Sequence, residues 1–128
     1  MSCETICANN LTNNSAQTFK THITECGDSS VTIDASNFTE AIYRIFDTDN
    51  TTALVTATLT GGDIAVESDT DSEGNAINVF RTTLTKASML SSVVEAGQYS
   101  HSFKVTNSAG LELPPVFQNV VTVVEAYD

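Results

Sequence analysis

The sequence predicts an all-β fold: a single sandwich of seven to eight strands with one short helical crossover. Short apolar stretches alternate with turn-forming residues roughly every 8–12 positions, which is the spacing of sandwiches and barrels. Val, Ile and Thr dominate these stretches, and their branched side chains suit a pleated surface better than a helix. The 128 residues suffice for one domain with a core. We expect an extended, polar N-terminal arm over residues 1–16 and the sandwich over residues 17–128.

In the first half of the sandwich, the side-chain pattern alternates with period two. Phe19 and Ile23 alternate with polar neighbours, as in a half-buried strand. The stretch Phe38–Asp47 is apolar on both parities, which is typical of a central strand covered on both faces. We expect four strands here, at Gln17–Ile23, Val31–Asp34, Phe38–Asp47 and Ala53–Thr60.

The second half continues with strands around one helical segment. Residues 67–75 read as an acidic hairpin tip, and Lys86–Val93 favours a helix, with Thr85 as its N-cap and Gly97 beyond its end. Because an isolated helix of this length is marginal, we expect a crossover of one or two turns. The strands expected here are Ile64–Val66, Ala76–Leu84, Gln98–Thr106 and Val116–Val124.

The charge of the chain excludes two classes of partner. Sixteen Asp and Glu residues oppose five Lys and Arg, which gives a formal net charge of −11. Nucleic-acid binding requires Lys and Arg to replace the counterions of the phosphates, and anionic membranes also attract cations. We therefore expect neither nucleic acid nor a membrane as partner. No stretch approaches the ~18 apolar residues of a membrane span, and the N-terminus lacks the pattern of a signal peptide.

The cysteines and a histidine near the N-terminus are candidate metal ligands. Cys3, Cys7, His22 and Cys26 are the ligand types of a Cys₃His zinc site, although the spacing is loose and Gln17–Ile23 resembles a strand. A Cys7–Cys26 disulfide and three unpaired thiols are the alternatives. An odd number of cysteines without a signal sequence is typical of a reducing compartment. These alternatives stay open, and we assign no metal or cofactor.

The acidic hairpin tip is a second candidate cation site. Asp69, Asp71 and Glu73 offer oxygen ligands at every second position before Gly74, as a calcium-binding EF-hand loop begins. The closing Glu of such a loop is replaced by Phe80, and the flanks resemble strands. A solvated hairpin tip is therefore the simpler interpretation.

Catalytic motifs are missing from the sequence. There is no G-x-S-x-G elbow, no phosphate-binding glycine loop and no H-E-x-x-H pair. His101 alternates with Tyr99 and Phe103, as a half-buried strand residue does. With no Trp and few aromatics, the composition also supplies little for stacking sugars. We expect a protein that is not an enzyme, without catalytic or cofactor-binding residues.

One region resembles small β-sandwich virion proteins of tailed bacteriophages. The resemblance rests on Asp63-Ile-Ala-Val66, on Val79-Phe-Arg-Thr-Thr-Leu-Thr-Lys86 and on the stretch from Glu95 to Gly110. In that class a strand ending in Leu-Thr precedes a short helical crossover, a Gly-x-Tyr opening and a turn ending in Gly. Gly97, Tyr99 and Gly110 occupy these positions, and the pattern covers about residues 17–125.

The resemblance implies an immunoglobulin-like or phage-type sandwich with a structural role. A capsid decoration (cement) protein is the expected function, with the major capsid protein as partner and a homotrimer as the assembly. The protein would be made in the host cytoplasm and lie on the capsid surface of the virion. By analogy, residues 1–14 would be an arm that clasps the capsid. A baseplate or tail-fibre adaptor and a calcium-assisted carbohydrate-binding module are the alternatives.

Overall fold

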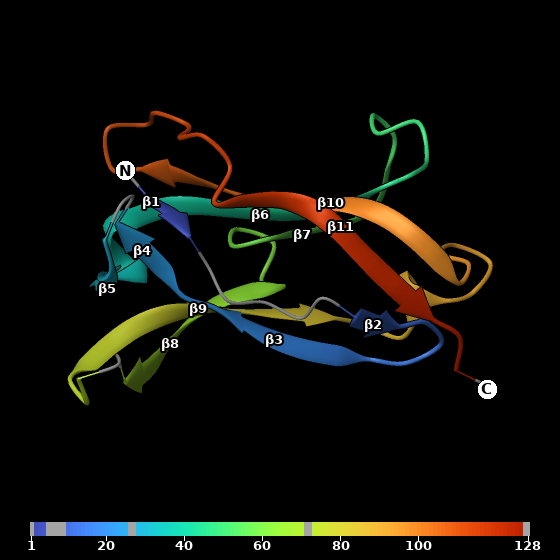
Figure 1. The fold of residues 1–128 in the computed structure, drawn as a ribbon, viewed down its shortest axis with the longest axis horizontal. Helices are drawn as coiled ribbons and strands as arrows, with labels where there is room; N and C mark the ends of the chain where they lie inside the picture. The colour runs from blue at the N-terminus through green and yellow to red at the C-terminus, as the bar shows by residue number, and fades with distance from the viewer. Residues whose placement is uncertain (1, 5–9, 26–27, 71–72, 127–128) are drawn as a thin grey trace.

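The computed structural model describes residues 2–4, 10–25, 28–70 and 73–126, and within them it is an all-β sandwich (Figure 1). One layer is a five-stranded sheet of order β2-β11-β10-β6-β7, and the other has the order β3-β9-β8. The strands are β1 Ser2–Glu4, β2 Asn10–Thr12, β3 Gln17–Thr21, β4 Ile23–Glu25, β5 Asp28–Ile33, β6 Phe38–Phe46, β7 Ala53–Thr58, β8 Ile64–Thr70, β9 Ala76–Leu84, β10 Gly97–Asn107 and β11 Phe117–Val124.

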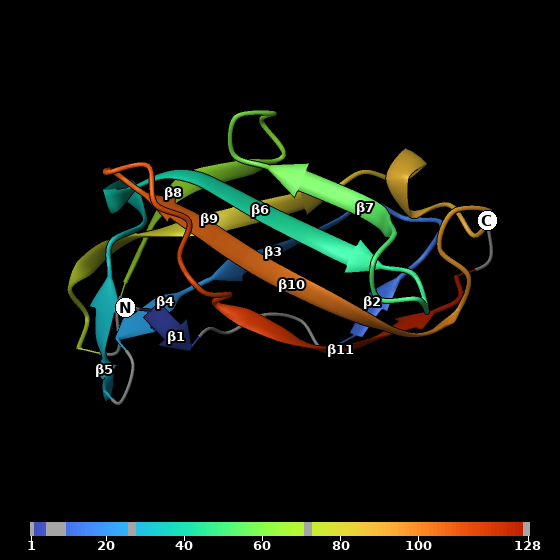
Figure 2. The same cartoon turned by 90° about the horizontal axis from the view of Figure 1, so that it is seen from above.

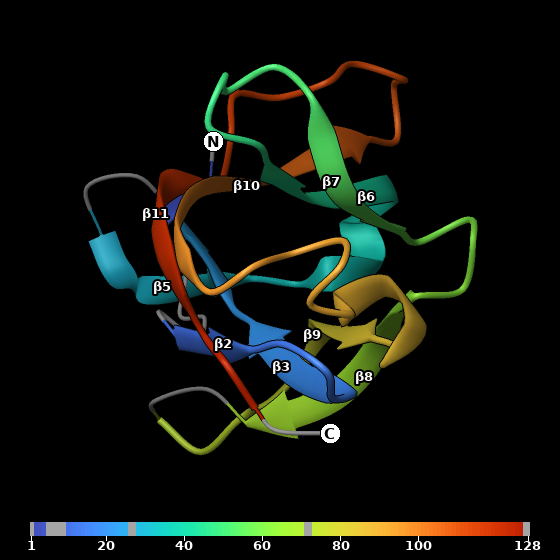
Figure 3. The same cartoon turned by 90° about the vertical axis from the view of Figure 1, so that its right-hand side faces the viewer.

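The strand order is that of an immunoglobulin-like sandwich. Strands β6, β7, β10 and β11 lie in one sheet and β3, β8 and β9 in the other, so the chain repeatedly crosses between layers. The end-on view shows the two layers facing each other (Figure 3). Tyr99, near the start of β10, donates its hydroxyl to the carbonyl of Glu95 at 2.8 Å. This contact has the form of the tyrosine corner that such sandwiches use.

Residues 10–13, which lie in the stretch expected to be an extended arm, are joined to the sandwich. β2 pairs in parallel with β11, with Leu11 opposite Val123, and Leu11 is 2% exposed. Asn13 is fully buried, and its side chain bonds to the carbonyl of Val94 and the amide of Ala126. Leu11 is surrounded by polar residues in the sequence, so no hydrophobic periodicity indicates this strand.

A further small sheet lies at one end of the molecule. It has the order β1-β4-β5, and β4 follows β3 after the single residue His22 (Figure 2). The sequence predicted a strand that begins only at Val31. In the structure β5 begins earlier, at Asp28, and pairs with β4 in a hairpin. Pairing with β4 gives the backbone of Ser2–Glu4 its hydrogen-bond partners.

The crossover between β9 and β10 confirms the predicted helical turn but is shorter. A 3₁₀ helix spans Ala87–Met89, and turns follow it as far as Val93. Met89 is fully buried, and its amide donates to the carbonyls of Thr85 and Lys86. A second 3₁₀ turn, Ala35–Asn37, was not predicted and is capped by the side chain of Asp34.

Aromatic side chains from both sheets meet in the core. Phe19 packs edge-on against Tyr43 at 5.1 Å between ring centroids, and Phe80 packs against Phe103 at 5.6 Å. These pairs join β3 to β6 and β9 to β10, so they connect the two layers. Aromatic contacts of this kind contribute about 0.5–1.5 kcal/mol beyond the burial of apolar area.

Two buried hydroxyls in the three-stranded sheet lack partners. Thr21 and Thr82 are fully buried, and neither hydroxyl has a hydrogen-bond partner within the described ranges. An unmade bond of this kind costs about 1–3 kcal/mol. We expect Thr21→Val and Thr82→Val each to raise the free energy of unfolding by about 1 kcal/mol in urea titrations. Thr18→Val, on the exposed face of β3, is the control, with a change within about 0.5 kcal/mol. Lower stability of both buried variants would contradict the interpretation that these hydroxyls are unpaired.

Candidate functional site

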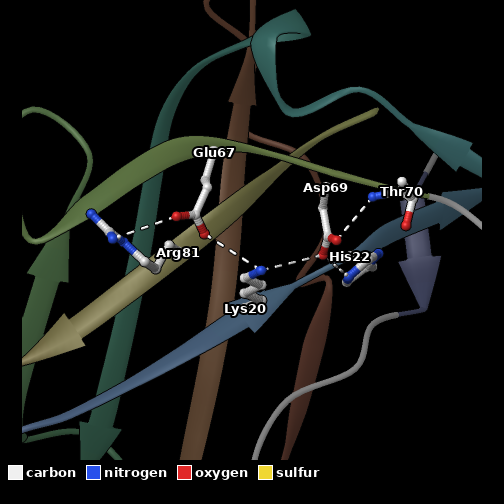
Figure 4. Close-up of polar contacts among 6 residues, drawn as sticks. All are labelled: Lys20, His22, Glu67, Asp69, Thr70 and Arg81. Carbon is white, nitrogen blue, oxygen red and sulfur yellow. Dashed lines mark hydrogen bonds and ion pairs between the residues drawn. The ribbon is translucent and has the colours of Figure 1, made fainter. Parts of the chain in front are cut away.

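A ladder of alternating charges crosses the outer face of the three-stranded sheet (Figure 4). Arg81 Nη1 lies 3.5 Å from Glu67 Oε1, and Lys20 Nζ lies 3.7 Å from Glu67 Oε2. Lys20 Nζ also lies 3.6 Å from Asp69 Oδ2, which His22 Nε2 approaches to 3.2 Å. These side chains are partly exposed, so each pair contributes little to stability, about 0–1 kcal/mol.

The strand register explains how this ladder forms. β9 lies between β3 and β8. Lys20 on β3 pairs with Arg81 on β9, and Glu67 on β8 pairs with Val79 on β9. Val79 has the same parity as Arg81, so it faces outward, yet it is only 1% exposed. The aliphatic stems of the charged side chains can therefore shield an apolar residue on this face.

The structure places the predicted calcium ligands in this ladder only in part. A hydrogen bond from the amide of Thr70 lowers the pKa of the Asp69 carboxyl most, and the nearby Lys20 and His22 lower it further. The carboxylate is therefore ionised and already has partners within the protein. Glu73 is exposed, and Asp71 lies outside the described residues. Within the described ranges no three His, Cys, Asp or Glu side chains gather as metal ligands would.

The predicted zinc or disulfide site falls mostly outside the described residues. Cys7 and Cys26 are among the residues that the structure leaves out, so both hypotheses stay predictions. Pairing of β1 with β4 places the backbone of Cys3 beside the segment between His22 and Cys26. His22 itself contacts Asp69 rather than a second nitrogen or sulfur ligand in the described region.

His101 is buried in the core rather than half-buried on a strand face. It is 1% exposed, its Nδ1 lies 2.8 Å from Tyr43 Oη, and its Nε2 lies 2.6 Å from Asn119 Oδ1. Because the Asn119 oxygen can only accept, Nε2 carries the proton and Nδ1 accepts from the tyrosine hydroxyl. Both ring nitrogens are therefore engaged by the protein.

Burial of His101 gives the protein a pH dependence. Desolvation lowers the pKa of His101 below its ordinary value of 6.5, although the bond to Asn119 opposes this shift. The unfolded chain therefore takes up the proton first as the pH falls. The contribution of His101 to the free energy of unfolding is fully present above pH 6.5. Below that pH it decreases, by at most about 1.4 kcal/mol per pH unit, until the pKa of His101 in the folded protein is reached.

Urea titrations between pH 5 and pH 8 measure this effect. We expect the decrease below about pH 6.5 to persist in His22→Gln and to disappear in His101→Gln, whatever the absolute stability of each variant. An unchanged slope in His101→Gln would assign the effect to other groups.

At lower pH a second loss of stability is expected, because hydrogen bonds from Ser36 and Asn78 lower the pKa of Asp34 to about 2. The stability that Asp34 contributes is lost between its ordinary pKa of 3.8 and about 2.

The outer face of the five-stranded sheet holds two adjoining hollows. The larger, about 260 Å³, is lined by Phe46, Asn50, Ser100, Ser102, Lys104 and Gln118. The smaller, about 190 Å³, is lined by Thr48, Asn50, Gln98, Tyr99, Ser100 and Val120. The Ser100 hydroxyl donates to Asn50 Oδ1 at 2.8 Å, and both hollows share these two residues. No sequence motif marks this arrangement, because its residues come from β6, β10, β11 and the turn after β6.

The turn after β6 is held by its own polar groups. The carboxylate of Asp49 accepts hydrogen bonds from the amides of Thr51 and Thr52 and from the Thr52 hydroxyl. These bonds hold the pKa of Asp49 well below its usual range. Asn50 has a φ of 60°, a conformation that Asn tolerates better than most residues. The turn therefore fixes the Asn50 amide between the two hollows.

Comparisons with known proteins give a similarity in structure. No protein-family model matches the chain, and no curated protein matches it. Among solved structures, murine CRIg is similar over 96% of this chain and 97% of its own, with 6% identity and a TM-score of 0.39. Among the described residues, no helix is long and apolar enough to cross a membrane.

Proposed function

We propose that this chain is a non-enzymatic virion structural protein, a capsid decoration (cement) protein that binds and stabilises the assembled phage head. Its partner is the major capsid protein, and it assembles as a homotrimer on the capsid surface after synthesis in the host cytoplasm. The observation that carries the proposal is the free edge of the five-stranded sheet, strand β7.

Strand β7 lacks the features that usually protect a sheet edge. Its sequence, Ala53-Leu-Val-Thr-Ala-Thr58, contains no charged residue and no proline. The amide of Leu59 donates to the carbonyl of Ala41, so the opposed residues 59 and 41 form a hydrogen-bonded pair. Hydrogen-bonded pairs alternate along an antiparallel ladder. The amides of Thr56 and Thr58 therefore point away from β6 and can pair with a strand of another protein.

The remaining polar groups support a structural role rather than a catalytic one. His101 is engaged on both nitrogens, and the carboxylate of Glu40 binds the amides of Leu59 and Thr60 next to β7. The elements of the phage resemblance also serve the fold, since Tyr99 forms the corner contact after the 3₁₀ crossover. The net charge of −11 favours a soluble protein before docking.

The alternatives are separated by where the protein binds. A baseplate or tail-fibre adaptor could use the same edge, so the location on the virion decides between the two roles. The calcium-assisted carbohydrate-binding module has less support, because the Asp69 carboxylate already contacts Lys20 and His22.

Co-sedimentation with purified phage heads tests the proposal. We expect saturable binding of a chain that light scattering shows to be trimeric. Thr56→Pro removes an outward amide without removing a ladder bond to β6, so it should abolish binding while thermal melting confirms the fold. Thr56→Ser, which keeps the amide, is the matched control and should bind. Binding to tails or baseplates but not to heads would contradict the decoration role, and unchanged binding of folded Thr56→Pro would contradict docking through β7.

A further inference from the structure

We infer that the two adjoining hollows on the outer face of the five-stranded sheet bind an acidic oligosaccharide, with a uronic acid residue in the larger one. This inference is independent of the proposed docking through β7, which lies at the sheet edge. It also differs from the calcium-assisted alternative, because no carboxylate lines either hollow.

The floor of the larger hollow carries an unpartnered hydroxyl. Ser102 is 3% exposed, lines the hollow and has no hydrogen bond from its hydroxyl within the described part of the chain. Its strand, β10, lies between β6 and β11, so its backbone groups are already paired. A peptide strand therefore cannot add to the sheet here, and side chains alone must recognise the ligand.

The lining offers the groups that bind a sugar. The hydroxyl of Ser102 and the amides of Asn50 and Gln118 can donate and accept, which suits a ligand with many hydroxyls. Phe46 also lines the larger hollow, and its ring can pack against a pyranose. Two hollows that share Asn50 and Ser100 fit two consecutive sugar residues.

The charge of the larger hollow selects an acidic sugar. Lys104 lines it, and its Nζ lies 3.7 Å from Glu112 Oε1, whose side chain is 59% exposed. Such an exposed pair is weak, so a ligand carboxylate can replace Glu112. Arg44, opposite Ser102 on β6, adds a second cation and has no ion-pair partner within the described ranges. Lys104 and Arg44 thus place two cations close together on a chain with a net charge of −11.

Titration of the ¹⁵N-labelled protein tests the inference. The probes are short fragments of hyaluronate, alginate and polygalacturonate, with maltotetraose as the neutral counterpart. We expect at least one acidic fragment to shift the amides of Ser100, Ser102 and Asn50 with a dissociation constant on the order of 1 mM. Maltotetraose should bind at least about tenfold more weakly, because it lacks the carboxylate. EDTA should leave the binding unchanged.

Matched variants locate the site. Ser102→Val fills the floor, and Lys104→Met removes the cation, so each should weaken binding at least about tenfold. Thr56→Ser, on the same face but outside the hollows, should bind as the unchanged protein does. The inference would be overturned if no acidic fragment changed the amide chemical shifts at a fragment concentration on the order of 10 mM, tenfold the expected dissociation constant. Unchanged binding of the folded Ser102→Val and Lys104→Met, or loss of binding in EDTA, would also overturn it.

Discussion

Tyr43→Ala is expected to lower the free energy of unfolding by about 3–5 kcal/mol, a large part of the roughly 5–15 kcal/mol that stabilises a domain. Tyr43 is fully buried on β6, and its ring packs against Phe19, His101 and Phe117. Truncation leaves a cavity between the two sheets and removes the donor that His101 Nδ1 requires. Urea titration at pH 7.5 measures the change.

Tyr43→Phe separates these two contributions. It keeps the ring and removes only the hydroxyl, so it is expected to lower stability by about 1–3 kcal/mol, the cost of leaving His101 Nδ1 without its partner. If Tyr43→Phe were as stable as the unchanged protein, the hydrogen bond between Tyr43 and His101 would not contribute to stability.

Asn13→Ala is expected to have the next largest effect, a loss of about 2–4 kcal/mol. Asn13 is fully buried just after β2, and its Nδ2 donates to the carbonyl of Val94 at 3.0 Å. Its Oδ1 accepts from the amide of Ala126, also at 3.0 Å. One side chain therefore joins the N-terminal strand, the loop after the 3₁₀ crossover and the segment after β11, and alanine leaves both backbone groups unpaired.

Two further variants make this result specific. Asn13→Asp keeps an acceptor for Ala126 but presents an oxygen to the Val94 carbonyl, so it should be at least as unstable as Asn13→Ala. Asn10→Ala, at an exposed position of β2, should change stability by less than about 0.5 kcal/mol. Equal stability of Asn13→Ala and Asn10→Ala would show that the described N-terminal segment is not fixed to the sandwich.

Local patterns were sufficient to predict most of the strands. Alternation in Gln98–Thr106 and the two-sided apolar pattern of Phe38–Asp47 correspond to β10 and β6, the central strands of the larger sheet. β10 was predictable because every second residue faces the core, and that period is visible in the sequence. β6 was predictable from its long apolar run, although only one of its faces is fully buried. The helical crossover was predicted for a related reason, since Thr85 and Gly97 bound a short segment of helix formers.

The parts that were missed depend on contacts between distant residues. β2 is only three residues long, and its pairing with β11 cannot be read from its own polar sequence. The hydrogen bonds of Asn13 span 81 and 113 positions. The hollows combine Asn50 of a turn with Ser102 and Gln118 of two strands, so no motif marks them. The chain has few aromatic residues, and the sequence does not indicate that Phe46 lines the larger hollow and Tyr99 the smaller one.

The acidic residues have structural roles that composition alone did not reveal. Asp34 caps the first 3₁₀ turn and accepts from the amide of Asn78 on β9 at 3.1 Å. Asp49 and Glu40 accept several backbone amides at the two ends of β7. Carboxylates that accept backbone amides fix turns beside strands, so part of the net charge of −11 also shapes the sheet edge proposed to dock.

Amide hydrogen exchange on the protein bound to phage heads tests the proposed function most directly. The amides of Thr56 and Thr58 point away from β6 in the free protein, so they should exchange rapidly. We predict that binding to heads slows their exchange at least about tenfold, while the exposed turn at Gly61 and Gly62 is unchanged. Rapid exchange at Thr56 and Thr58 in protein that co-sediments with heads would contradict docking through β7.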